Sequence, residues 1–265
     1  MNKRILTEIW IYPVKSLGGI RLKSSQVMGK GLRYDRRWML VDENNMFMTQ
    51  RICHSMALFK LSFVENGFKI QFKTDSHILP LHHQVIDTPL DVQVWDDRMK
   101  AFEVSEESSR WFSERLGLNC KLVFFPEENQ RLIDEKFRVN NEQVSLADAY
   151  PLLVVGQSSL NDLNERLEDP VPMNRFRPNL VFTGGEAFEE DQWKDFTVGS
   201  NRFVGIKPCA RCILTTINQD TAEKGREPLL TLSNYRKRDS KIYFGLNSVP
   251  VDQNEIKEGD EIIFK

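Results

Sequence analysis

The segment 58-LFKLSFVENGFKIQF-72 places the pair Asn66-Gly67 between two runs in which apolar residues alternate with polar ones. Alternation with a period of two is typical of a half-buried β-strand, and an Asn-Gly pair between two such runs indicates a hairpin turn. We therefore predict a β-hairpin with Leu58–Val64 and Phe68–Phe72 as its strands.

Similar short runs, separated by polar turns, continue on both sides of this hairpin. In the first half they are Thr7–Tyr12, Arg37–Val41, Met46–Thr49, Leu90–Trp95, Met99–Val104 and Lys121–Phe125. In the second half they are Leu152–Val155, Leu180–Thr183, Asn201–Ile206, Ile213–Ile217, Lys241–Leu246 and Glu261–Phe264. Regular short strands with polar turns are typical of barrels and sandwiches. We predict a mainly β (α+β) protein with two β-barrel-like domains and a few peripheral helices.

Helices are few in this pattern. Ser105 is placed to cap a helix that ends before Gly117, because acidic residues follow the serine and glycine is the usual residue after a helix. A second helix is expected to carry Leu160, Leu163 and Leu167 on one face. The polar segment Pro126–Asn141 separates the two halves, so the predicted domains are residues 1–125 and 126–265.

Charge and composition exclude several classes of protein. The 265 residues include 36 Lys and Arg against 38 Asp and Glu, which is not the basic excess expected of a nucleic-acid-binding protein. No window of about 18 apolar residues exists, so no membrane span is predicted. Four cysteines are too few for a disulfide scaffold, which favours reduced thiols and a cytoplasmic protein. The adjacent His82 and His83 would point to opposite faces of a strand and are not predicted to bind metal.

The pair Cys209-Ala210-Arg211-Cys212 is the sharpest local feature. A structural zinc site needs four ligands, and no second C-x-x-C is present. A thioredoxin-like pair would begin a helix, whereas the β-branched residues of Ile213–Ile217 predict a strand. Two interpretations remain open: a pair of small buried thiols, or one thiolate bound to a soft metal and assisted by the cations Lys207 and Arg211.

The turn Gly156-Gln157-Ser158-Ser159 lies between a predicted strand and a predicted helix. Free backbone N–H groups and hydroxyls at a helix start can bind an anion, which makes Ser158 and Ser159 candidate ligand-binding residues. Simple capping of the helix by either serine explains the same pattern.

Several motifs occur in one order along the chain and resemble the molybdenum-cofactor sulfurase C-terminal (MOSC) domain and its N-terminal β-barrel partner. Together they cover nearly the whole sequence, and the set is similar to the mitochondrial amidoxime-reducing component and its bacterial relatives. The matching segments are Tyr12-Pro13-Val14-Lys15-Ser16, residues 31–38, Phe176-Arg177-Pro178-Asn179, residues 189–193 and residues 207–216.

The resemblance implies a molybdenum cofactor (Mo-molybdopterin) whose metal is bound by one cysteine. The matching position is Cys212, the implied catalytic and metal-ligating residue, while Cys209 would be a non-ligating neighbour. The implied cofactor-binding residues are Lys15, Ser16, Arg36, Arg177 and Asn179. The predicted set also includes Arg211, the cation beside Cys212, and Ser158 and Ser159 from the turn.

The implied reaction is reductive and independent of pyridoxal phosphate: a small N-hydroxylated compound loses oxygen as water, so that N–OH becomes N–H. The four cysteines include no plant-type iron–sulfur motif, so we expect electrons from a separate iron–sulfur or haem protein. Two alternatives stay open: a persulfide-carrying sulfur-transfer module with Cys212 as the acceptor, and a protein that binds the cofactor without turnover.

Overall fold

The structure is a computed structural model that describes residues 3–81, 85–138 and 140–264. The predicted hairpin is present, as β6 (Phe59–Val64) and β7 (Gly67–Phe72), but Glu65 and Asn66 form its two-residue loop and Gly67 already pairs with Val64. A Cβ atom on Gly67 would lie 2.3 Å from the Leu79 carbonyl oxygen. Glycine is therefore required by the close approach of β8 (Asp75–Pro80).

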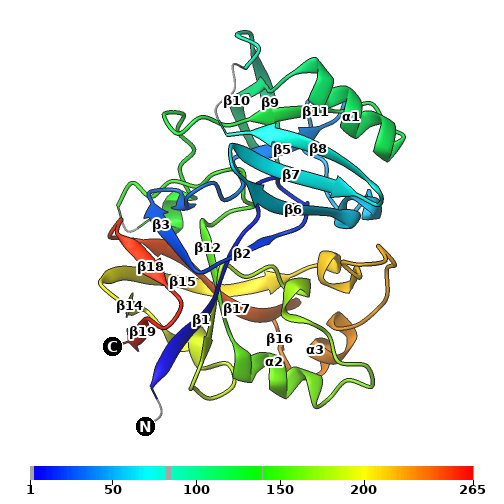
Figure 1. The fold of residues 1–265 in the computed structure, drawn as a ribbon. Helices are drawn as coiled ribbons and strands as arrows, with labels where there is room; N and C mark the ends of the chain where they lie inside the picture. Colours follow the sequence, from blue (N-terminus) through cyan, green and yellow to red (C-terminus); the bar gives the residue numbers. More distant parts are fainter. Residues whose placement is uncertain (1–2, 82–84, 139, 265) are drawn as a thin grey trace.

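The first half of the chain forms two small sheets and one longer helix (Figure 1). One sheet is β6-β7-β8, and the other has the order β5-β11-β10-β9. As predicted, Ser105 caps α1, where its Oγ accepts a hydrogen bond from the Ser108 N–H at 3.1 Å, and Gly117 ends the helix with φ of 66°. The remaining elements of this half are β2 (Ile20–Leu22), β3 (Ser24–Met28), β4 (Gly31–Leu32), β5 (Trp38–Val41), the 3-10 helix η1 (His54–Leu58), β9 (Pro89–Val94), β10 (Asp97–Glu103), α1 (Glu106–Leu116) and β11 (Lys121–Phe124).

The second half closes into a seven-stranded barrel with the order β12-β13-β1-β19-β14-β15-β17, in which β17 pairs back with β12. The N-terminal strand β1 (Arg4–Ile11) lies between β13 and β19, as the blue strand among the C-terminal ones shows in Figure 1. The other elements are η2 (Glu135–Phe137), β12 (Leu152–Gly156), α2 (Gln157–Asn164), η3 (Met173–Arg175), β13 (Leu180–Thr183), η4 (Glu189–Gln192), β14 (Asp195–Val198), β15 (Asn201–Arg211), η5 (Ile213–Thr216), α3 (Leu229–Tyr235), β16 (Lys237–Arg238), β17 (Lys241–Pro250), β18 (Glu255–Lys257) and β19 (Glu261–Phe264).

The predicted mainly β class is confirmed, and the boundary at residue 125 stays a prediction. The first half nevertheless contributes β1 to the barrel, and its β3 pairs with β18. His82 and His83, which are not predicted to bind metal, lie outside the described residues. Among the described residues, no helix is both long enough and apolar enough to cross a membrane.

Two predicted strands are wrong. Met46–Thr49 makes isolated bridges instead of a strand. The segment after Cys212 forms the 3-10 helix η5, because threonine side chains bond to the backbone: Thr215 Oγ1 donates to the Cys212 carbonyl at 3.0 Å and Thr216 Oγ1 to the Ile213 carbonyl at 2.8 Å. Such local bonds compete with sheet pairing. The preceding strand β15 is correspondingly longer than predicted and runs to Arg211.

Candidate functional site

A cavity of about 350 Å³ is lined by residues from both halves of the chain. It brings together Lys15, Ser16, Arg36, Arg177, Asn179, Arg211 and Cys212, which are seven of the nine predicted site residues. Among the described residues that line it, six are cationic and one is a carboxylate: Lys15, Arg36, Arg51, Arg177, Lys207, Arg211 and Asp148. The cavity therefore suits an anionic ligand.

Cys212 lies where β15 ends and η5 begins, in an extended backbone conformation. Its carbonyl accepts hydrogen bonds from the Thr215 N–H at 3.1 Å and from Thr215 Oγ1 at 3.0 Å. These two bonds fix the backbone of Cys212, while its side chain lines the cavity.

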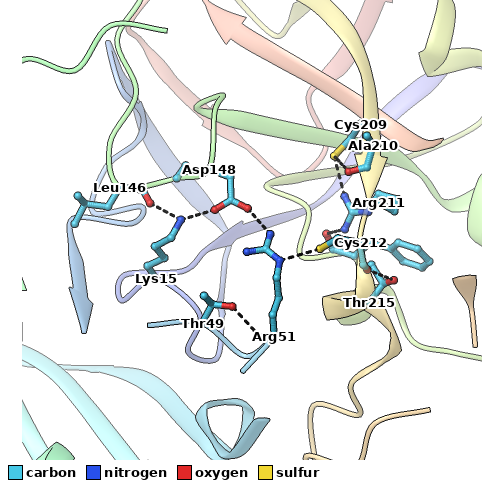
Figure 2. A network of polar contacts seen from close by, with 12 residues as sticks. Lys15, Thr49, Arg51, Leu146, Asp148, Cys209, Ala210, Arg211, Cys212 and Thr215 are labelled. Carbon is cyan, nitrogen blue, oxygen red and sulfur yellow. Dashed lines mark hydrogen bonds and ion pairs between the residues drawn. The ribbon is translucent and has the colours of Figure 1, made fainter. Parts of the chain in front are cut away.

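A chain of polar contacts connects Cys212 to Lys15 across the cavity (Figure 2). The Arg51 Nε–H donates to the Cys212 sulfur at 3.2 Å, and Arg51 Nη2 donates to Asp148 Oδ2 at 2.8 Å. The other carboxylate oxygen of Asp148 accepts from Lys15 Nζ at 2.5 Å, and the Leu146 carbonyl accepts from the same ammonium at 2.8 Å. One carboxylate thus joins two cations that face the cavity.

Burial and neighbouring charges shift the pKa values of Lys15, Asp148 and Arg51 in opposite directions. Burial lowers the pKa of Lys15 to about 8, although Asp148 opposes the shift. Burial alone would raise the pKa of Asp148, but Lys15 and Arg51 outweigh it and hold that pKa below its usual range. Burial likewise lowers the pKa of Arg51, and its contacts with Asp148 and Cys212 reverse the shift upward. At neutral pH Asp148 is therefore an anion between two cations.

The loop that presents Asp148 is held by Arg131, which is 6% exposed. Its guanidinium donates to the carbonyls of Ser145, Ala147 and Asp148 at 2.8, 2.6 and 3.1 Å. Five N–H groups in a planar fork allow one side chain to satisfy several carbonyls in this way.

A second group of predicted residues packs around Tyr12. The guanidinium carbons of Arg36 and Arg177 lie 4.5 and 4.1 Å from the centre of the Tyr12 ring. Arg36 Nη1 donates to Asn179 Oδ1 at 3.1 Å and pairs with buried Asp35, and Arg177 Nη1 donates to the Leu17 carbonyl at 2.7 Å. Burial lowers the pKa of Arg177 to about 10 and raises that of Tyr12 to about 12.

Three of the predicted residues have left-handed backbone conformations that non-glycine residues rarely adopt. The φ values are 67° for Ser16, 50° for Arg36 and 56° for Arg177. Each such residue costs of order 1–3 kcal/mol and tends to lie at a functional site. Their coincidence at one cavity supports a ligand-binding role for this wall.

The two cysteines of the pair accept hydrogen bonds from different arginines. Cys212 accepts from Arg51, whereas the Cys209 sulfur accepts from Arg211 Nη1 at 3.1 Å. Arg211 Nη2 also donates to the Phe176 carbonyl at 2.6 Å, and its buried Nε has no hydrogen-bond partner among the described residues. An acceptor atom on a bound ligand would satisfy that donor.

Ser158 and Ser159 do not line the cavity. Helix α2 begins at Gln157, so both serines lie inside its first turn and the expected capping role is wrong. Ser158 Oγ donates to the Gly185 carbonyl at 2.6 Å, and Ser159 Oγ donates to Glu190 at 2.8 Å. Burial raises the pKa of Glu190 to about 7.

Sequence reasoning missed Arg51 and Asp148. Arg51 is 161 residues from Cys212 and 97 from Asp148, and no spacing rule connects them. Nothing in the sequence around Thr49-Gln50-Arg51 indicates that Arg51 contacts the Cys212 sulfur.

The cavity fits an anionic, sulfur-bound cofactor. It supplies the thiols of Cys209 and Cys212, six cations and the unsatisfied buried Nε–H of Arg211. Among the described residues, no group of three or more His, Cys, Asp or Glu side chains could hold a metal, so a metal at Cys212 would bring its other ligands with a cofactor. Fold and site together define a β-barrel protein with a cationic ligand cavity that Cys209 and Cys212 both line.

Residues 141–263 match the family described as MOSC domain, and residues 4–119 match the MOSC N-terminal beta barrel domain. Over 88% of its length the chain is 32% identical to mitochondrial amidoxime-reducing component 1 of Mus musculus, covering 72% of that protein. It is 32% identical to mitochondrial amidoxime reducing component 2 of Homo sapiens, with 88% and 73% covered.

A molybdenum cofactor sulfurase of Oryza sativa is 31% identical over 96% of this chain, which spans 33% of that longer protein. Among solved structures, the YUAD protein from Bacillus subtilis is similar over 99% of this chain and 97% of its own, with a TM-score of 0.42 and 10% identity, too low to support an inference. The chain belongs to the MOSC family, with a MOSC N-terminal barrel domain ahead of the MOSC domain.

Proposed function

We propose that this protein is an oxidoreductase that binds the molybdenum cofactor through Cys212 and reduces small N-hydroxylated compounds. The observation that carries the proposal is the Cys212 sulfur in a cavity lined by six cations, in a chain whose relatives are named amidoxime-reducing components. The balanced reaction is R–NHOH plus two electrons and two protons, giving R–NH₂ and water.

The residues of this chain would bind and orient the cofactor. Cys212 would ligate the metal, while Lys15, Arg36, Arg177 and Arg211, with Ser16 and Asn179, would hold its anionic phosphate end. A cofactor-binding role of Ser158 and Ser159 stays a prediction. Their hydroxyls bond to the Gly185 carbonyl and to Glu190, outside the cavity. When bound, the cofactor supplies two-electron redox chemistry at molybdenum. A separate iron–sulfur or haem protein would deliver the electrons, and we propose the cytoplasm as the compartment.

The decisive experiment compares two cysteine variants made in a host supplied with molybdate. We expect Cys212→Ala to fold normally, to contain little molybdenum and to lose more turnover than the 10–100-fold that removal of an outer-shell group costs. Cys209→Ala should keep most turnover, because its sulfur contacts Arg211 instead. Turnover is followed as oxidation of a reduced viologen dye by an N-hydroxylated compound, and equal loss in both variants would favour a dithiol mechanism.

A second candidate function is sulfur transfer, which the similarity to molybdenum cofactor sulfurases favours. In that case the Cys212 thiolate would take the outer sulfur of a persulfide donor, so that R–S–SH and Cys212–SH give R–SH and Cys212–S–SH. The product would be detectable by mass spectrometry after incubation with that donor, and the purified protein would contain little molybdenum. A protein that contains molybdenum but fails to oxidise the dye would instead bind the cofactor without turnover.

A further inference from the structure

Arg51 reaches the Cys212 sulfur from the opposite half of the chain. It lies between β5 and η1 in the first half, whereas Cys212 follows β15 in the second. The Nε–H donates to the sulfur at 3.2 Å, in the range for a hydrogen bond to sulfur (Figure 2). The thiol that the proposed function assigns to the metal is thus hydrogen-bonded by an arginine side chain.

Arg51 is itself held from three directions. Its Nη2 donates to Asp148 at 2.8 Å, its guanidinium carbon lies 4.7 Å from the centre of the Trp95 ring, and its backbone N–H donates to Thr49 Oγ1 at 2.8 Å. Trp95 has a φ of 55°, a rare conformation for an aromatic residue, at the turn between β9 and β10. These contacts restrict the planar guanidinium to one orientation, with Nε–H toward the sulfur and Nη2 toward the carboxylate.

We propose that Arg51 is a positioning residue for Cys212: it fixes the direction of the sulfur so that the thiolate meets the metal in one geometry. Groups that hydrogen-bond a metal ligand set its orientation, and their loss typically costs 10–100-fold in metal affinity or activity. The role toward molybdenum rests on the proposed function, whereas the contact between Arg51 and the sulfur does not.

A purely structural role makes a different prediction. If Arg51 served to pair with Asp148 and join the halves, its loss would lower stability equally whether or not residue 212 carried sulfur. Lysine would then replace it well, because a single ammonium can pair with a carboxylate. An ammonium is a point donor without a rigid fork and cannot hold the sulfur and the carboxylate contacts in the same geometry.

The first test uses cofactor-free protein and a double-mutant cycle of Arg51→Met and Cys212→Ala. We expect the two losses in melting temperature not to add, with the double variant about 2–4 °C above the additive value. Arg98→Met removes an exposed arginine that bonds Gln93, and we expect it to be additive with Cys212→Ala. Additivity for Arg51 as well would overturn the proposed contact, whatever the function of the protein.

The second test uses protein from a molybdate-supplied host. We expect Arg51→Met to fold as wild type by circular dichroism, to retain less molybdenum after dialysis and to lose about 10–100-fold in kcat, with KM within about twofold. Arg51→Lys should recover little, and added methylguanidine should partly restore Arg51→Ala. Full activity in Arg51→Lys, or molybdenum content equal to wild type in Arg51→Met, would refute the positioning role. A wild-type protein without molybdenum would refute the proposed function and leave the first test decisive for Arg51.

Discussion

Lys15 is expected to destabilise the cofactor-free protein at neutral pH, and its replacement by methionine tests this. The side chain is 5% exposed, and its ammonium lies between the Leu146 carbonyl and Asp148. Burial lowers its pKa from 10.5 to about 8, against the attraction of Asp148. The charged form is therefore less stable in the folded protein than in the unfolded chain, even though it is paired.

The size of this effect follows from linkage. A difference of about 2.5 pH units, at ~1.4 kcal/mol each, amounts to ~3 kcal/mol of lost stability below pH 8. Between pH 8 and 10.5 the unfolded chain binds more protons than the folded protein, so the free energy of unfolding rises with pH and the penalty disappears. Methionine keeps much of the stem volume without the charge, but the Leu146 carbonyl and Asp148 Oδ1 both lose their donor, at about 1 kcal/mol each.

Lys15→Met should therefore raise the free energy of unfolding by about 1 kcal/mol at pH 7, or the melting temperature by about 2 °C. The gain should shrink from pH 8 and turn into a loss of about 2 kcal/mol above pH 10.5, where the charge penalty is gone and the lost hydrogen bonds remain. Thermal and urea unfolding of cofactor-free protein at half-unit pH steps would measure both quantities, with Lys23→Met, at a side chain 87% exposed, as the control. A Lys15→Met variant that is less stable at pH 7, with an unchanged pH slope, would refute the reasoning.

Two further changes probe the fold away from the cavity. Burial raises the pKa of Glu190 to about 7, so the wild-type free energy of unfolding should fall by up to ~3 kcal/mol between pH 4.5 and 7. Glu190→Gln should flatten that fall in urea unfolding, and an identical slope in the variant would contradict this. Ser105→Ala removes the acceptor of the Ser108 N–H and should cost about 1 kcal/mol in thermal unfolding; an unchanged melting temperature would show that the cap contributes nothing.

Elements with complete local signals could be predicted from the sequence. Helix α1 has its cap at Ser105 and its glycine stop at Gly117 within a dozen residues, and both behave as predicted. The strand predicted over Ile213–Ile217 is wrong, although its β-branched residues favour a strand. The hydroxyls of Thr215 and Thr216 bond to nearby backbone carbonyls, and these bonds favour a tight turn. The strand propensity of β-branched residues is a weak preference, and hydrogen bonds from a side chain to a nearby carbonyl can outweigh it.

The residues of the candidate site likewise differ in how far the sequence could predict them. Cys212 could be found because its motif is local, and the resemblance added partners such as Lys15 and Arg177. Arg51 and Asp148 could not, because the contacts of Arg51 with Cys212 and with Asp148 depend on how two distant halves pack. For Ser158 and Ser159 the strand-turn-helix pattern was present, but the hydroxyls were already used by Gly185 and Glu190.

The position of β1 explains why both halves are needed for one cavity. Strand β1 separates β13 from β19 in the ring, so a second half without it would expose two strand edges where the barrel is now closed. The chain that leaves β1 leads directly to Lys15 and Ser16 on the cavity wall. Closing the barrel and placing the first cation are thus achieved by one continuous segment, which ties the stability of the second half to the formation of the site.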